Sequence, residues 1–461
     1  MERTAVEARA QPLGEAEGAA QAFADEWWRT YVPKQHQASL YNQVEGLLKQ
    51  LSGEPAPPVR LLKLSWIESW VKRVGASSSG LALPRRQQLE RDHPEAFLNA
   101  EEVRGLPLPP GFASLSETSA GARIAAISHA WATPTHPDPK GEQLTRFVNQ
   151  VSKQRGPCPR GRCVWLCPAT DDGCLSEIEP DCPGWRSLAV RSAMLACWPL
   201  FAGCAEGCVC GCIPYRGQGC GHSVRSLPHG EFALFYDYAS LPQKDDEGRR
   251  TPDEHALFQT ALDKMGSWYA HSLATTFVMD VPSDSAVLPY AQRGWPTFER
   301  AVSALAKPSA GDTYTRIIED SRGRNGRAYR TPPMHPKAFA CVLASKVFTN
   351  GKSDCELVAS LYADTLMGAF GHSRKLEFSH CNWGDDELHQ LAQVLHFAKR
   401  VTILFIDSNP GIGKRGLDAL AVPLEEGSNP FLTNVVVSQP ERSELLCAVC
   451  RRRKIRCGLH I

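Results

Sequence analysis

The sequence predicts an α/β protein: a parallel sheet with flanking helices, preceded by further helices and followed by a short repeat array. Three apolar runs, at 123–128, 231–238 and 274–280, have the composition of buried strands. Segments with helical spacing separate these runs, and two of the runs end on an aspartate. Strands alternating with helices are typical of a parallel sheet that is covered on both faces.

The bulk composition is that of a soluble globular protein. Of the 461 residues, 43% are hydrophobic and 22% are charged. The length exceeds what one hydrophobic core usually spans, which predicts two to four domains. The formal net charge of +1 provides no strong field, so we do not expect nucleic acid or anionic lipid as a partner. The first thirty residues lack a signal-peptide apolar run, and the most apolar stretch, 193–205, is too short to span a membrane. We therefore expect a cytoplasmic protein without a transmembrane segment.

Changes in composition and pattern divide the chain into segments. The second segment is expected to be helical because Leu62, Trp66, Ile67 and Trp70 fall on one helical stripe. The expected segments are a disordered leader at 1–22, a helical region at 23–118, an α/β domain at 119–350 with a cysteine-rich insertion at 157–230, repeats at 356–440, and a basic tail at 441–461.

Helices are expected between and after the three strands. The stretch 141–154 has helical spacing. Thr251, Pro252 and Glu254 form a helix start, with a cap residue, a first-turn proline and a capping-box glutamate, and the apolar stripe continues to Trp268. The last helix of the domain is expected at 295–307. Side chains at the carboxyl ends of the strands would share one edge of the sheet, where such sheets bind ligands.

Four stretches resemble a known superfamily. AAISHAW, HPDPKGEQL, FYDYASLPQ and RGWPTFE occur in the order found in Toll/interleukin-receptor-like domains and the related heterokaryon-incompatibility-like modules. The resemblance covers roughly residues 122–305, apart from the cysteine-rich insertion. In NAD-cleaving members, the glutamate of a W-C-x-x-E step is catalytic; here Trp295 and Glu299 match, and Pro296 replaces the cysteine. The resemblance therefore implies cleavage of the nicotinamide–ribose bond of NAD by Glu299, and self-association of the domain.

Glu299 is also unusual in physical terms. On a helix it shares a face with Trp295 and Val302, so its carboxylate should be partly desolvated. At the rim of a cleft such a carboxylate can accept hydrogen bonds from ribose hydroxyls and stabilise an oxocarbenium-like transition state. The alternative is an ion pair with Arg293 or Arg300 that only holds the helix in place.

The other candidate substrate-binding residues follow the first two strands. Ser128, His129 and Trp131 lie where the resemblance places a ligand-contacting loop, and Asp237 follows the second strand. Trp295 completes the set. Structural alternatives stay open, because a histidine can cap a strand and an aspartate at a strand end often forms a turn.

The cysteine-rich insertion raises the question of a metal. Eleven of the 17 cysteines fall between Cys158 and Cys220. Zinc sites usually contain C-x2-C pairs, which this segment lacks, so a cysteine-rich loop or a lipidated patch are the alternatives to zinc. The candidate ligands are Cys204, Cys208, Cys210, Cys212 and Cys220.

A repeat follows the α/β domain. LEFSHC at 376–381 and LFIDSN at 404–409 are 28 residues apart, and each precedes a glycine-containing turn and a leucine/alanine helix. This pattern resembles leucine-rich repeats of the ribonuclease-inhibitor type, which implies protein partners. A third, degenerate strand is expected at 434–437. So few repeats cannot bury a core alone, so we expect them to pack on the preceding domain.

The tail contains a second cysteine pattern. CAVCRRRKIRCG, at 447–458, resembles the first half of the fungal binuclear zinc-cluster motif, which needs six cysteines where this stretch has three. The alternatives are a nuclear import signal, weak nucleic-acid binding, chance similarity or a truncated sequence. Three functional hypotheses result: an NAD-cleaving signalling protein, a non-catalytic interaction scaffold, and a nuclear factor.

Overall fold

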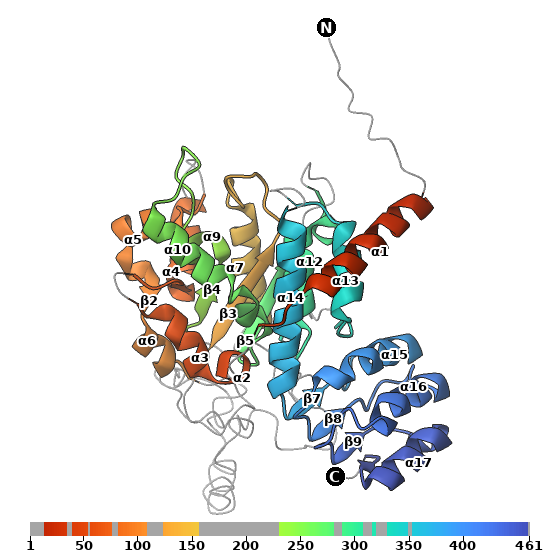
Figure 1. The fold of residues 1–461 in the computed structure, drawn as a ribbon. Helices are drawn as coiled ribbons and strands as arrows, with labels where there is room; N and C mark the ends of the chain where they lie inside the picture. The colour runs from red at the N-terminus through yellow and green to blue at the C-terminus, as the bar shows by residue number, and fades with distance from the viewer. Residues whose placement is uncertain are drawn as a thin grey trace, which may run out of the picture.

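In the residues that it describes, the computed structural model contains two β-sheets surrounded by helices (Figure 1). One sheet has six strands and the other has four. The predicted α/β class is therefore confirmed. The structure describes residues 13–34, 39–53, 56–75, 82–107, 123–155, 230–280, 288–307, 316–319, 330–348 and 353–459.

The six-stranded sheet is mixed rather than wholly parallel, which corrects the prediction. Strands β3 to β6 run parallel in the order β4-β3-β5-β6, while β1 is antiparallel to both of its neighbours, β2 and β4. The chain goes from β3 to β4 on one side and then returns to β5 on the other. Open α/β sheets bind ligands where the strand order reverses in this way. The strands are β1 (Leu61–Lys63), β2 (Phe97–Leu98), β3 (Ile124–His129), β4 (Ala233–Phe235), β5 (Ala274–Met279) and β6 (Ile317–Glu319).

The expected N-terminal helical region contributes two strands to this sheet. The helix predicted from position 61 begins only at Leu64, as α4 (Leu64–Gly75), because Leu61 and Leu62 belong to β1. Both leucines are fully buried, and Leu62 pairs with Leu234 of β4. Burial between two strands outweighs the helical spacing of the apolar residues, which is a local signal only.

The predicted leader is also partly structured. Helix α1 (Leu13–Thr30) takes in residues 13–22, which the prediction assigned to disorder. The segment is rich in alanine, the best helix former, and it packs against α13 (Pro336–Ala344). The Trp27 indole N–H donates to Ser360 of α14 (Ser353–His372) at 3.1 Å. These contacts with helices that are distant in the sequence hold α1 on the domain.

Helices cover both faces of the six-stranded sheet, as predicted. Side chains alternate along β3: Ala125 and Ile127 face one core, while Ile124 and Ala126 face the other. On the first face lie α4, α5 (Arg86–Asp92) and α7 (Glu142–Arg155). The second face is covered by α11 (Met265–Ala270), α12 (Gly294–Ser303) and α14.

Shorter helices complete the domain. Helix α10 begins with the predicted capping box, in which Thr251 and Glu254 bond to each other's backbone N–H. It ends at Leu262, and α11 follows as a separate helix, so the single helix predicted to run through Trp268 is interrupted. The remaining helices are α2 (Ser39–Asn42), α3 (Val44–Leu48), α6 (Ala100–Gly105), α9 (Asp237–Ser240) and α10 (Pro252–Leu262).

The second sheet is wholly parallel, with order β10-β9-β8-β7. Its strands include the three predicted at the repeat positions, and its helices lie along one side of it (Figure 1). The segment predicted as a separate tail forms α17 and β10, so it continues this sheet. The elements are β7 (Lys375–Glu377), α15 (Asp385–Val394), β8 (Ile403–Phe405), α16 (Lys414–Glu425), β9 (Asn434–Val436), α17 (Glu444–Arg453) and β10 (Arg456–Cys457).

Buried Asn409 ties successive turns of the second sheet together. Its carbonyl oxygen accepts from the backbone N–H of Cys381 at 2.9 Å and of Trp383 at 3.1 Å. Its amide donates to the carbonyls of Phe378 and Ile406 at 2.8 and 2.9 Å. One side chain thereby satisfies four backbone groups that would otherwise be buried without partners.

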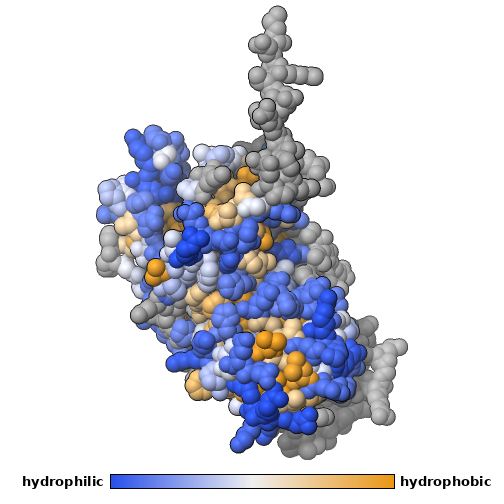
Figure 2. All heavy atoms as spheres, turned by 45° about the vertical axis from the view of Figure 1, so that its right-hand side comes forward, coloured by the Kyte–Doolittle hydropathy of each residue, from blue (hydrophilic) through white to orange (hydrophobic). Residues whose placement is uncertain are grey.

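The second sheet packs on the α/β domain, as predicted for this part of the chain. One continuous apolar core joins α11, α12 and α14 to residues of β7 and β8. Arg330 bridges the two parts: its guanidinium donates to the carbonyls of Ala304 and Leu305 and to the carbonyl of Glu377, and it lies over the Phe378 ring. Figure 2 shows apolar surface grouped among hydrophilic residues on the lower part of the molecule.

Candidate functional site

The candidate residues gather where the strand order reverses, at the carboxyl end of β3. Glu299, on α12, is 3% exposed. Its carboxyl group shares a hydrogen bond of 2.6 Å with the Ser128 hydroxyl. It also bonds to the Tyr269 hydroxyl and the His129 backbone N–H. Ser128 in turn shares a short hydrogen bond with the hydroxyl of Tyr290. Alternation along β3 explains this arrangement, because Ser128 falls on the face that α11 and α12 cover.

His129 points to the other face and pairs with Asp237. The imidazole Nε2 lies 2.9 Å from one Asp237 oxygen, and the Trp131 indole N–H donates to the second oxygen at 3.0 Å. The ring stacks on Tyr236, with centroids 4.7 Å apart. An ionised aspartate only accepts, so Nε2 must be the protonated nitrogen. The remaining nitrogen, Nδ1, is buried without a hydrogen-bond partner among the described residues.

The pKa values of the two carboxyl groups in the cluster, Glu299 and Asp237, are shifted in opposite directions. Burial, and then the negative charge of Asp237, raise the pKa of Glu299 well above its ordinary value. Burial also acts to raise the pKa of Asp237, but the charge and hydrogen bond of His129 and the Trp131 N–H outweigh it, so that pKa is lowered. The surroundings therefore favour the neutral form of Glu299 and the ionised form of Asp237. Carboxyl groups with pKa values driven apart are common in acid–base sites.

The structure changes two expectations about Glu299. Its carboxyl was expected at the rim of a cleft, yet it is buried, while Trp131 and Asp237 are the partly exposed members of the cluster. Trp295 was expected beside it, but the indole N–H donates to Asp354 of α14 at 2.9 Å, and the ring contacts Phe298. The indole is thus directed toward the helix layer and not to the proposed substrate site.

The alternative role of Glu299 was an ion pair with Arg293 or Arg300, and the structure shows neither pair. Arg300 instead pairs with Glu319 of β6. The Arg293 side chain donates to the carbonyl of Leu288 at 3.3 Å. The Glu299 carboxyl therefore obtains its hydrogen bonds from hydroxyl and amide groups, not from a cation.

Sequence reasoning missed three tyrosines of the cluster. Tyr236, Tyr269 and Tyr290 are all buried against it. Tyr290 lies in the turn just before RGWPTFE, and its hydroxyl also donates to the Pro296 carbonyl at 2.9 Å. In the sequence, Tyr236 could have been found only because it follows a predicted strand, and Tyr290 only because it precedes the RGWPTFE stretch. Tyr269 lies on α11, which carries no motif that would have pointed to the site.

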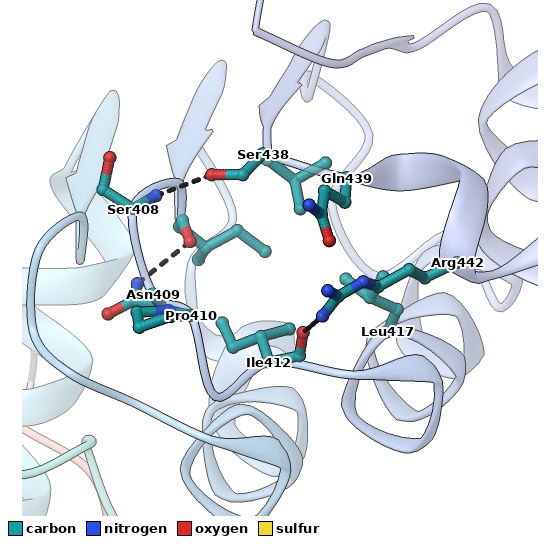
Figure 3. Close-up of a pocket in the computed structure, with 10 residues that line it drawn as sticks. Ser408, Asn409, Pro410, Ile412, Leu417, Ser438, Gln439 and Arg442 are labelled. Atoms are coloured by element: carbon teal, nitrogen blue, oxygen red, sulfur yellow. Dashed lines mark hydrogen bonds between the residues drawn. The ribbon is translucent and has the colours of Figure 1, made fainter.

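A separate pocket of about 280 Å³ lies at the carboxyl ends of β8 and β9 (Figure 3). The side chains of Gln439 and Arg442 face the turn at Asn409 across it. One guanidinium N–H of Arg442 donates to the Ile412 carbonyl at 2.8 Å, and Arg442 forms no ion pair with any described residue. The volume of this pocket suits a single small chemical group. The apolar walls come from Ile406, Ile412, Leu417 and Val437.

No metal site is apparent in the part of the chain that the structure describes. No group of three or more histidine, cysteine, aspartate or glutamate side chains there could hold an ion. This includes the cysteines of the predicted half zinc cluster. The candidates Cys204, Cys208, Cys210, Cys212 and Cys220 lie outside the described residues. Within the described ranges, no helix combines the length and the apolar character needed to cross a bilayer.

Comparisons with known proteins give no match. No family model matches the chain, and neither a curated protein nor a solved structure has significant similarity to it.

Proposed function

We propose that this chain is a cytoplasmic signalling protein whose first sheet is a Toll/interleukin-receptor-like domain of the heterokaryon-incompatibility-like kind, followed by leucine-rich repeats, and that it hydrolyses NAD. The position of Glu299 carries the proposal: it lies where the parallel strand order β4-β3-β5-β6 reverses, hydrogen-bonded to Ser128. The resemblance assigns the catalytic role to this glutamate. Ser128, His129 and Asp237 from the other matching stretches surround it.

The chemistry suits a buried acid. The nicotinamide ring of NAD carries a positive charge, and a cation bound beside Glu299 favours the ionised carboxylate over the neutral acid. The carboxylate then faces the positive charge that develops on the ribose as the bond to nicotinamide breaks. Because water is excluded around Glu299, this attraction is stronger than in solution. Asp237 and Trp131, the partly exposed members, form the side of the cluster from which a ligand would enter.

Nicotinamide release from NAD by the purified full chain tests the proposal. Glu299→Gln preserves the shape and the acceptor for Ser128, and we expect it to lower the rate at least about 100-fold, the usual effect of removing one transition-state contact. Glu319→Gln is the matched control, a buried carboxyl of the same sheet, and should stay within a few fold of wild type once folding is verified by circular dichroism. Equal rates for Glu299→Gln and wild type would refute a catalytic role.

A second candidate is a non-catalytic scaffold that binds protein partners through the repeats. The pocket in Figure 3 favours it, because Arg442 can pair with a carboxylate while the apolar walls accept a short aliphatic group. A peptide bearing both groups would fit this description. The same assay separates the two candidates, since a folded wild-type chain that releases no nicotinamide would exclude the NAD hydrolase.

A further inference from the structure

Three cysteines of the C-terminal segment come together in the fold. Cys447 and Cys450 lie on α17, and Cys457 lies on β10. The Cys450 side chain is 2% exposed, whereas Cys457 is half-buried and packs against the same core. All three are free thiols. They cannot close the metal site that their spacing resembles, so their proximity calls for another chemistry.

The turn after α17 brings Cys457 back to Cys450. Lys454 adopts a left-handed conformation, with φ of 57°. The N–H of Lys454 donates to the Arg451 carbonyl and the N–H of Ile455 to the Cys450 carbonyl, at 3.2 and 2.8 Å. These are the two hydrogen bonds of a Schellman motif, which ends the helix and reverses the chain. The side chains of Cys450 and Cys457 are then hydrogen-bonded to each other.

Cys447 is oriented differently. Its Sγ donates to the Pro440 carbonyl at 3.3 Å, on the preceding turn. The geometry therefore selects Cys450 and Cys457 as the reacting pair. Two thiols in contact can be oxidised to a disulfide through a sulfenic acid on one of them.

We propose that Cys450 and Cys457 form a redox-active pair that a peroxide oxidises to a disulfide between α17 and β10. The thiolate of one of the two cysteines attacks one peroxide oxygen, the O–O bond breaks, and a sulfenic acid and hydroxide form. The sulfur of the other cysteine then attacks the sulfenic sulfur, the S–O bond breaks, and the second oxygen leaves as water. Two thiols and one hydrogen peroxide thus give one disulfide and two waters. Reduction by a dithiol reverses the step.

The product would fix the end of the second sheet. Strand β10 has two residues and is held on β9 by backbone bonds from Arg456 to Thr433 and from Gly458 to Val435, at 2.8 and 3.1 Å. A covalent link to α17 removes the freedom of this short edge strand to separate. Oxidation would therefore stabilise the end of the repeats without any new partner.

Peptide mapping of the full-length chain after brief hydrogen peroxide treatment and alkylation tests the pairing. Trypsin places Cys447 and Cys450 in peptide 443–451 and Cys457 in peptide 457–461. We expect a linked peptide in wild type that dithiothreitol removes. Cys447→Ser should retain the link, and Cys450→Ser and Cys457→Ser should each reduce it at least about tenfold. The partly exposed Cys341 provides a further control, since Cys341→Ser should leave it unchanged.

Three results would overturn the proposal: no linked peptide from folded wild type, a link that survives in Cys450→Ser but is lost in Cys447→Ser, or a link only between two chains. Mixing ¹⁵N-labelled and unlabelled protein before oxidation distinguishes the last case, because a bond within one chain contains no mixed-isotope pair. Circular dichroism of each variant before oxidation establishes that a missing link does not reflect unfolding.

Discussion

Glu299 and Asp237 are near neighbours whose surroundings act on them in opposite ways. The raised pKa of Glu299 means that the folded chain holds a proton that the unfolded chain has released, and the lowered pKa of Asp237 means the reverse. Burial without a cation explains the first, and the bonds from His129 and Trp131 explain the second. The two residues should therefore have opposite effects on how stability depends on pH.

We expect Glu299→Gln to become more stable relative to wild type as the pH rises. Above the unfolded pKa, near about 4.3, and up to the raised folded pKa, wild type loses up to about 1.4 kcal/mol of unfolding free energy per pH unit through this group, and the glutamine variant does not. Urea unfolding followed by circular dichroism at several pH values between about 5 and 8 measures the difference. A difference that does not vary with pH would show that Glu299 is ionised in the fold.

Asp237→Asn should show the opposite trend. Its loss costs about 1–3 kcal/mol at neutral pH, because hydrogen bonds to a charged group disappear. The lowered pKa contributes stability that is present above the unfolded pKa and is lost as the pH falls through the folded pKa, so wild type and variant should converge below about pH 4. The same unfolding measurements in acid test this, and a gap that widens there would contradict the assignment.

Helix α12 begins with a glycine for a reason that the sequence motif does not reveal. A Cβ built on Gly294 would overlap the ring of Phe348, which packs over the start of the helix. The RGW step therefore needs glycine to admit a side chain more than fifty residues away. The strand and helix patterns around the motif were predictable from local periodicity, whereas this contact depends on the return of the chain after α13.

Gly294→Ala should destabilise the protein by about 1–3 kcal/mol, the usual cost of overpacking a buried position. Gly105→Ala, in open space at the end of α6, is the control and should be neutral or slightly stabilising. Combining Gly294→Ala with Phe348→Leu should recover part of the loss. Thermal unfolding of wild type and the three variants measures the effects, and equal transitions for Gly294→Ala and Gly105→Ala would rule out the steric explanation.

The two sheets form one connected body through Arg330 and the shared apolar core. Three backbone carbonyls from both parts depend on the Arg330 guanidinium, and the indole N–H of Trp383 donates back to the Arg330 carbonyl at 2.7 Å. We expect interleaved contacts of this kind to couple the unfolding of the second sheet to that of the first.

Arg330→Ala should cost about 2–4 kcal/mol, because it leaves buried carbonyls without donors. It should also separate the unfolding of the two sheets. Arg330→Lys, which retains the charge but not the forked geometry, should lie between the variant and wild type. Urea transitions followed by tryptophan fluorescence and by circular dichroism should coincide for wild type and diverge for Arg330→Ala; coincidence in both would show that the core alone couples the sheets.

The amino-acid order by itself determined the α/β class, the strands at 124–129, 233–235, 274–279 and the repeat positions, and the placing of Ser128, His129 and Asp237 at strand ends on one sheet edge. These follow from period-two and period-3.6 patterns, which local residues encode. Glu299 was expected beside them only from the resemblance. Only tertiary structure decided that Leu61–Lys63 pairs as a strand, that Glu299 is closed off from solvent, that Trp295 turns to α14, and that the cysteine tail completes the second sheet. Each depends on which distant surface a side chain meets, and burial against that surface outweighs the local preference of the segment.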